Sequence, residues 1–215
     1  MKARTVASRI WITVVSLAVL TAVHILAWFC LGDGVAVLSP LVTTLIGLVA
    51  YGAGLCYWIV IAWRWASMLT AERGHCVLGL VLMACFAGAF FTGGAPACHL
   101  GIRYRVGSGA LPCIRQWASA FCRRPDSAGY RWYRGDAAAF PDCVRRLRPE
   151  FVIGSEYGVQ GSAGSRPGAA CVVIAWGGGF LHWGLKVQGP GVRSLAAKPT
   201  PGVLAWRDGV YTFIE

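Results

Sequence analysis

Residues 176–184 combine glycine, histidine and tryptophan, a combination that suits the binding of a ligand. Glycine lets backbone N–H groups approach a bound molecule closely, and aromatic rings can line a pocket beside it. The stretch lacks the GxxxxGK[ST] pattern of a phosphate-binding loop. The same glycines also suit a tight hairpin whose tryptophans fill a core, so both interpretations stay open. The ligand-binding residues predicted from this stretch are Gly177, Gly178, Gly179, His182 and Trp183.

Cysteine supplies a second reactive side chain, and five of the nine cysteines follow residue 97. No CxxC or HxxxH spacing occurs, so a metal site is not predicted, and no cofactor motif is present. Thiols inside apolar helices behave as small hydrophobic groups. In the carboxy-terminal region, a disulfide between Cys122 and Cys143 would join two predicted helices if that region lies in an oxidising compartment.

A thiol paired with a histidine is the catalytic chemistry that these residue types allow. One of three cysteines would be the nucleophile and His182 the base, but no spacing selects one cysteine. The chain has neither a GxSxG nor an HExxH motif. A membrane-bound Cys/His enzyme is therefore an alternative interpretation. The three cysteines are Cys113, Cys143 and Cys171.

Arginine dominates the charge of the chain, with 17 arginines against three lysines and a net charge of +11. From residue 103 onward, the chain has 15 basic and seven acidic residues. The planar guanidinium suits phosphate and carboxylate groups, so anionic lipid or another acidic envelope component is a predicted partner, whereas a specific nucleic acid is not. A solvated surface without a partner explains the same charge. The predicted anionic-surface contacts are Arg103, Arg105, Arg145, Arg146 and Arg148.

The amino-terminal part of the chain contains three uncharged apolar runs, residues 10–31, 34–63 and 74–102. The candidate residues named above lie at the end of this region or after it. At about 1.5 Å per residue, each run is long enough as a helix to cross the roughly 30 Å hydrocarbon core of a bilayer. We predict membrane helices at about 10–31, 38–63 and 76–91, the last ended by Gly93, Gly94 and Pro96. Residues 1–101 then form a region of three transmembrane helices.

Basic residues in the flanks of these helices favour a cytoplasmic amino terminus. Five lie on one side of the membrane and three on the other, so with three crossings the carboxy-terminal region is extracytoplasmic. His24 is the only mid-span histidine, and no Asp, Glu, Lys or Arg lies inside a predicted span, which argues against a transporter. The five are Lys2, Arg4, Arg9, Arg64 and Arg73, and the three are Arg103, Arg105 and Arg115.

Residues 102–215 predict a small extracytoplasmic α+β domain. Apolar residues at helical spacing indicate a helix over 111–121, and a short basic helix is expected at 140–147. The period then changes to two, which is typical of strands with one buried face. Glycine-containing turns at 177–179 and 207–209 predict the hairpins of an antiparallel β-meander. The predicted strands are 151–153, 171–176, 180–187, 204–206 and 210–214.

Together these features predict an integral membrane protein that anchors a small basic domain with a binding or scaffolding role at the cell envelope. A second alternative, besides the Cys/His enzyme, is a sensor or assembly subunit whose helices recruit a membrane-protein partner. The lipid bilayer is the partner that all three interpretations share.

Overall fold

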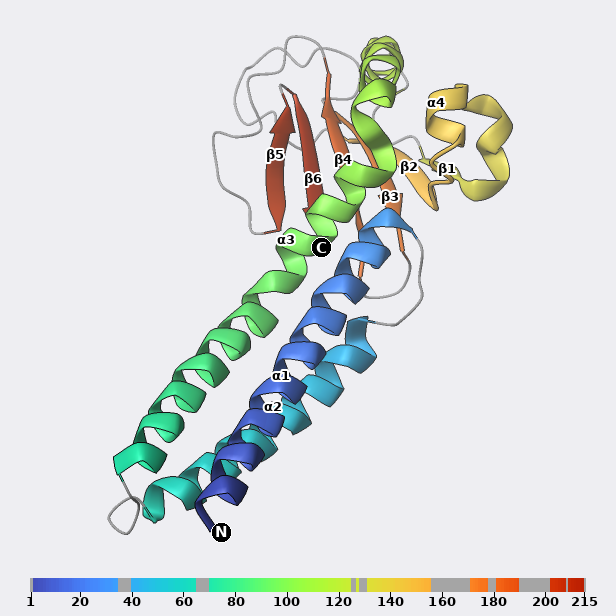
Figure 1. Ribbon diagram of the computed structural model, residues 1–215. Coiled ribbons are helices and arrows are strands. Elements are labelled where there is room, and N and C mark those ends of the chain that lie inside the picture. Colours follow the sequence, from blue (N-terminus) through green and yellow to red (C-terminus); the bar gives the residue numbers. More distant parts are fainter. Residues whose placement is uncertain are drawn as a thin grey trace, which may run out of the picture. The chain divides into compact units, whose positions relative to one another are not determined.

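The computed structural model describes residues 2–34, 40–64, 70–124, 127, 131–155, 171–177, 181–189, 202–207 and 209–214. The chain divides into two compact units, which we call the amino-terminal and the carboxy-terminal unit. The first consists of long helices, and the second contains a sheet (Figure 1). The amino-terminal unit comprises Met1–Leu31 and Val35–Ala97, and the carboxy-terminal unit comprises Gly32–Gly34 and Cys98–Glu215.

Three long apolar helices are consistent with the predicted membrane anchor. They are α1 at Lys2–Asp33, α2 at Pro40–Trp63 and α3 at Thr70–Cys122. Each contains a segment long and apolar enough to cross a membrane. Many of their large apolar side chains are exposed, and the exposed fraction is 74% in Val49 and 90% in Trp63. Because so much exposed apolar surface is unfavourable in water, these helices belong in a bilayer.

Helix α3 is much longer than predicted. The sequence indicated an end near Phe91, but the helix continues to Cys122 and departs from helical dihedral angles only at Gly107, where φ is 66° and ψ is 156°. Gly94 lies inside the helix and serves packing, because the Trp28 indole occupies the space that a side chain would need, with Nε1 only 2.8 Å from the position of a Cβ. In lipid, unpaired backbone groups are costly, which favours an uninterrupted helix even where glycine and proline occur.

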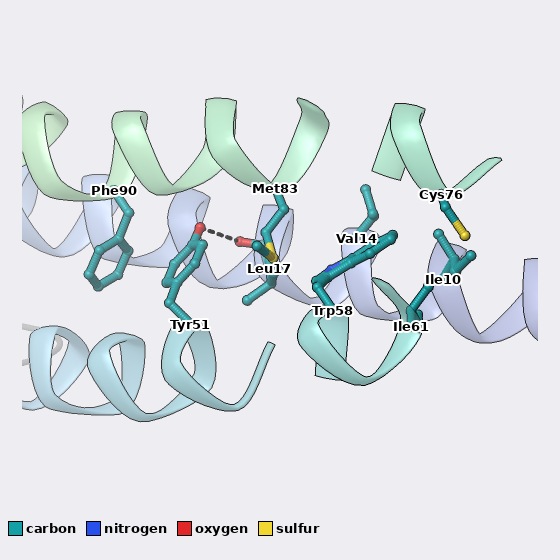
Figure 2. Packing of buried hydrophobic residues seen from close by; sticks show 9 residues of the cluster. All are labelled: Ile10, Val14, Leu17, Tyr51, Trp58, Ile61, Cys76, Met83 and Phe90. Carbon is teal, nitrogen blue, oxygen red and sulfur yellow. Dashed lines mark hydrogen bonds between the residues drawn. The ribbon is translucent and has the colours of Figure 1, made fainter. Parts of the chain in front are cut away.

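Each helix of the amino-terminal unit buries one narrow stripe of side chains, at spacings of three, four or seven residues. This spacing is typical of helices packed at a small left-handed angle, in which inward positions recur about every 3.5 residues. Figure 2 shows these side chains meeting between the three helices. The stripes are Ile10, Val14 and Leu17 in α1, Tyr51, Trp58 and Ile61 in α2, and Cys76, Met83 and Phe90 in α3.

His24 lies in the same bundle and is held in one neutral tautomer by its neighbours. The Trp28 indole Nε1–H, which can only donate, donates to His24 Nε2 at 3.1 Å. Nδ1 therefore carries the ring proton and donates to Thr43 Oγ1 at 3.0 Å, while the Thr43 hydroxyl donates to the Pro40 carbonyl at 2.9 Å. A second ring proton would face the Trp28 donor. His24 thus connects α1 to α2 through these hydrogen bonds.

The carboxy-terminal unit contains a six-stranded, fully antiparallel sheet, which confirms the predicted α+β class. The predicted meander is wrong in its last step, because the strand order is β1-β2-β3-β4-β6-β5 and β6, not β5, pairs with β4. The reason lies in composition, since residues 210–213 of β6 are buried whereas Leu204, Ala205 and Arg207 of the edge strand β5 are exposed. The strands are β1 at Arg131–Tyr133, β2 at Phe151–Ser155, β3 at Cys171–Trp176, β4 at Trp183–Gln188, β5 at Val203–Arg207 and β6 at Val210–Ile214.

The second part of α3 covers one face of this sheet (Figure 1). His99 Nδ1 lies 2.8 Å from Thr212 Oγ1 of β6, and the Phe121 ring packs against Trp132 of β1 with centroids 4.5 Å apart. On the face that bears Thr212 and Trp132, the residues Val152, Ile174 and Leu185 pair across β2, β3 and β4 and are fully buried. The helix and the sheet therefore share one core.

A disulfide joins Cys113 of α3 to Cys143 of the short helix α4, Asp142–Arg145, which follows the 3-10 helix η2, Arg134–Ala139. The predicted bond between Cys122 and Cys143 is wrong, because Cys122 is a free and buried thiol. Nine residues of helix amount to about two and a half turns, so Cys113 and Cys122 leave α3 on opposite faces. Cys122 is on the buried face and Cys113 is on the exposed one, where Cys143 can reach it.

Candidate functional site

The glycine-histidine-tryptophan stretch lies at the turn between β3 and β4, where Trp176 pairs with Trp183. Gly177 has a φ of 85°, and the Trp183 ring lies 2.1 Å from the position that a Cβ on Gly177 would occupy, so only glycine fits there. His182 is half-buried, with its ring centroid 5.4 Å from that of Phe151. The Trp183 indole N–H has no hydrogen-bond partner among the described residues. Gly178 and Gly179 lie outside the described residues, and ligand binding by this turn stays a prediction.

The structure does not bring His182 together with a reactive thiol. Cys113 and Cys143 are bonded to each other, so neither carries a free thiol. Cys171 is 2% exposed and pairs with Gln188, at the far end of the β3–β4 ladder from the Trp176–Trp183 pair. Five residue steps along a strand span about 17 Å. Cys171 and His182 are therefore too far apart for proton transfer between them.

Two of the arginines predicted as surface contacts make contacts within their own unit. Arg103 donates from Nη2 to the Ala205 carbonyl of β5 at 3.0 Å. Arg105 donates from Nη2 to the Leu147 carbonyl at 2.5 Å, and its guanidinium carbon lies 4.5 Å from the centroid of the Trp176 ring. The Trp176 indole donates to the same carbonyl at 2.9 Å. Both arginines thus connect α3 to the rest of its own unit.

The other three predicted arginines are exposed around α4. Arg145 forms an ion pair with Asp142, which lowers its availability for a partner. Arg146 and Arg148 are exposed, and Arg148 follows Leu147, whose carbonyl accepts the bond from Arg105. These two guanidinium groups fit the predicted role best.

Four charged residues form a group at the carboxyl end of α1, which we call the Asp33 cluster: Asp33, Arg105, Arg134 and Arg148. Asp33, Arg134 and Arg148 all interact electrostatically with Arg105. The Arg105 guanidinium also fills the space beside Gly34, where Nη1 lies 2.1 Å from the position that a Cβ would occupy. The cluster thus contains one carboxylate and three guanidinium groups, so positive charge predominates in it.

The carboxy-terminal unit also has a groove that the sequence does not indicate, and two further arginines line it. The groove has a volume of about 330 Å³ and lies between α3 and β5. The sequence places Arg115 in the flank of a membrane helix and Arg207 in a predicted turn. No sequence signal relates them, because 91 positions separate them and only the fold brings them together. The groove is lined by Ser108, Leu111, Pro112, Arg115 and Arg207.

Comparison with protein-family models, with curated proteins and with solved structures gave no match.

Proposed function

We propose that this protein is a membrane-anchored binding module, whose helices hold a small basic extracytoplasmic domain at the cell envelope, where it binds anionic phospholipid headgroups. The observation that carries this proposal is the Asp33 cluster. Asp33 is the last residue of α1, a helix long and apolar enough to cross the bilayer. Charged residues at the end of such a helix lie at the level of the headgroups, where each nearby arginine gains roughly 1 kcal/mol from an anionic surface.

Arg146 and Arg148 are the side chains that we assign to lipid contact. Both are exposed, and the bond from Arg105 to the Leu147 carbonyl ties the segment between them to the Asp33 cluster. Arg105 itself is held over the Trp176 ring and positions this segment rather than contacting lipid. Guanidinium groups suit the phosphodiester because they donate two parallel hydrogen bonds.

Binding to anionic lipid is tested on the full chain in nanodiscs or mild detergent, by native mass spectrometry. We expect the double variant Arg146→Gln/Arg148→Gln to retain several-fold less phosphatidylglycerol than the unchanged chain, whereas retention of phosphatidylcholine stays the same. The matched control is Arg123→Gln/Arg131→Gln, which removes the same charge from two other exposed positions of the unit. Equal lipid retention by the two double variants would show that only net charge matters, and the proposed contact would be withdrawn.

The proposal places the amino terminus in the cytoplasm and the carboxy-terminal unit outside. The excess of flanking basic residues favours this orientation, and so does the disulfide, because such bonds persist in oxidising compartments and are rare in the cytosol. Intact cells expressing either Arg131→Cys or His75→Cys are treated with a membrane-impermeant maleimide. We expect labelling at position 131 without lysis and labelling at position 75 only after lysis. The reverse pattern would invert the orientation.

A Cys/His enzyme is not proposed, because Cys171, the cysteine on the same sheet as His182, lies at the far end of the β3–β4 ladder from it. Recruitment of another membrane protein by the helices stays an alternative, and co-purification with residues 1–97 would favour it.

A further inference from the structure

The groove between α3 and β5 lies at the break in α3. Gly107 leaves the helical region, so a new helical segment begins at Ser108, and Ser108 lines the groove together with Leu111 and Pro112. Nothing lies within 4 Å of the position that a Cβ on Gly107 would occupy, so local crowding does not impose the break. The positive end of the segment's dipole lies beside the groove. Most of the positive charge, however, comes from two side chains on different elements.

Arg115 of α3 and Arg207 of β5 both line the groove, and no acidic side chain among the described residues neutralises their charge. Neither arginine has a hydrogen bond or an ion pair with another described residue. No carboxylate of the described residues lines the groove. Like charges that share one site repel each other, and an anion between them relieves this repulsion. The groove is therefore built to favour a negatively charged group.

The geometry points to a phosphoryl group as the ligand of this groove. Two guanidinium forks each donate two hydrogen bonds, and the Ser108 hydroxyl donates one more. A carboxylate has two oxygens and satisfies one fork, whereas a phosphate monoester has three terminal oxygens and up to two negative charges to share between both forks. The remaining lining, Leu111 and Pro112, is apolar and suits the organic part of the ester. The site thus takes a phosphate monoester whose substituent has an apolar surface.

This site is independent of the lipid contact proposed above, because Arg146 and Arg148 do not line the groove. Loss of one binding activity therefore need not change the other. The two are separated by testing the two double arginine variants in both assays.

The test is calorimetric titration of the full chain, purified in maltoside detergent, with phenyl phosphate as the probe. We expect binding of phenyl phosphate and an affinity that is at least roughly tenfold lower in Arg115→Gln/Arg207→Gln. Both substituted side chains are exposed, so the thermal unfolding temperature should not change. The controls Arg123→Gln/Arg131→Gln and Arg146→Gln/Arg148→Gln should bind as the unchanged chain does.

Three results would overturn the assignment: absence of binding by the unchanged chain, equal losses in the groove variant and a control variant, or benzoate binding as tightly as phenyl phosphate. The source of the phosphoryl group is tested by adding phosphatidic acid to the micelles. Displacement of phenyl phosphate supports the site with a lipid as the natural ligand. Unchanged titration supports the site with a soluble monoester.

Discussion

Replacing Cys113 and Cys143 by serine is expected to lower the free energy of unfolding of the carboxy-terminal unit by about 3.6 kcal/mol. The bond closes a loop with a sequence separation of 30 between α3 and α4, and loop-closure entropy in the unfolded chain sets this magnitude. For a unit of this size, the loss corresponds to a fall in unfolding temperature of roughly 15 °C. It is the largest single effect that we expect from a change in this unit.

The measurement is urea unfolding of the full chain in detergent, followed by near-ultraviolet circular dichroism. Micelle-embedded helices resist urea, so the transition reports the water-exposed unit. A reductant should destabilise the unchanged chain as much as the double serine substitution does, and it should not affect the double variant further. Cys122→Ala serves as a contrast, because Cys122 is a free thiol and its variant should keep the sensitivity to reductant. If reductant leaves the free energy of unfolding of the unchanged chain the same, the prediction is contradicted.

The disulfide also shows what sequence reasoning could have reached. The apolar positions Ile114, Trp117, Ala118 and Phe121 define the buried face of the helix, and Cys122 continues that face at a spacing of eight from Ile114. Cys113 lies on the opposite, exposed side of the helix and is therefore the better partner for Cys143, which lies on a separate helix. The helical phase was present in the sequence and excluded the Cys122–Cys143 bond that was predicted.

The packing of the membrane helices could not be read in the same way. In a soluble helix, polar residues mark the exposed face, but here both the inward stripe and the lipid-facing surface are apolar. What marks the inward surface is a set of buried polar side chains in the same helices, Thr21, His24 and Thr43. The length of α3 was missed for a related reason, since glycine and proline end helices in water more readily than in lipid.

The order of the last two strands in the sheet could not be predicted, because it depends on pairing between distant parts of the chain. The β5–β6 hairpin was predicted from its local turn, and the structure pairs these strands. The pairing of β6 with β4 depends on which of the two strands, β5 or β6, is buried by the rest of the fold. The local sequence pattern of the hairpin does not show which strand that is. The groove is a consequence of the same arrangement, because placing β5 at the edge of the sheet leaves Arg207 exposed near Arg115.

The second large effect is expected in the bundle, where Gly47→Ala should destabilise the packing of the helices by roughly 1–3 kcal/mol. A Cβ on Gly47 would lie 1.8 Å from Cζ of Phe90. The Phe90 ring has little room to move, because it stacks on His24 with centroids 4.0 Å apart and lies 5.2 Å from the Tyr51 ring. Overpacking should therefore outweigh the roughly 0.5–1 kcal/mol that alanine contributes to a helix interior.

Gly52→Ala is the matched control, because it makes the same substitution five residues later in α2, where nothing lies within 4 Å of a Cβ. Unfolding of the full chain by increasing the fraction of sodium dodecyl sulfate in mixed micelles reports the stability of the bundle. We expect Gly52→Ala to equal or exceed the unchanged chain and Gly47→Ala to unfold at a lower fraction. Adding Phe90→Leu should remove most of the penalty of Gly47→Ala, since a smaller side chain leaves room for the new methyl group, and the coupling between the two substitutions measures their contact directly. If Gly47→Ala is as stable as Gly52→Ala, then α2 and α3 do not approach each other at these residues, and the inward stripe of α2 must be reassigned.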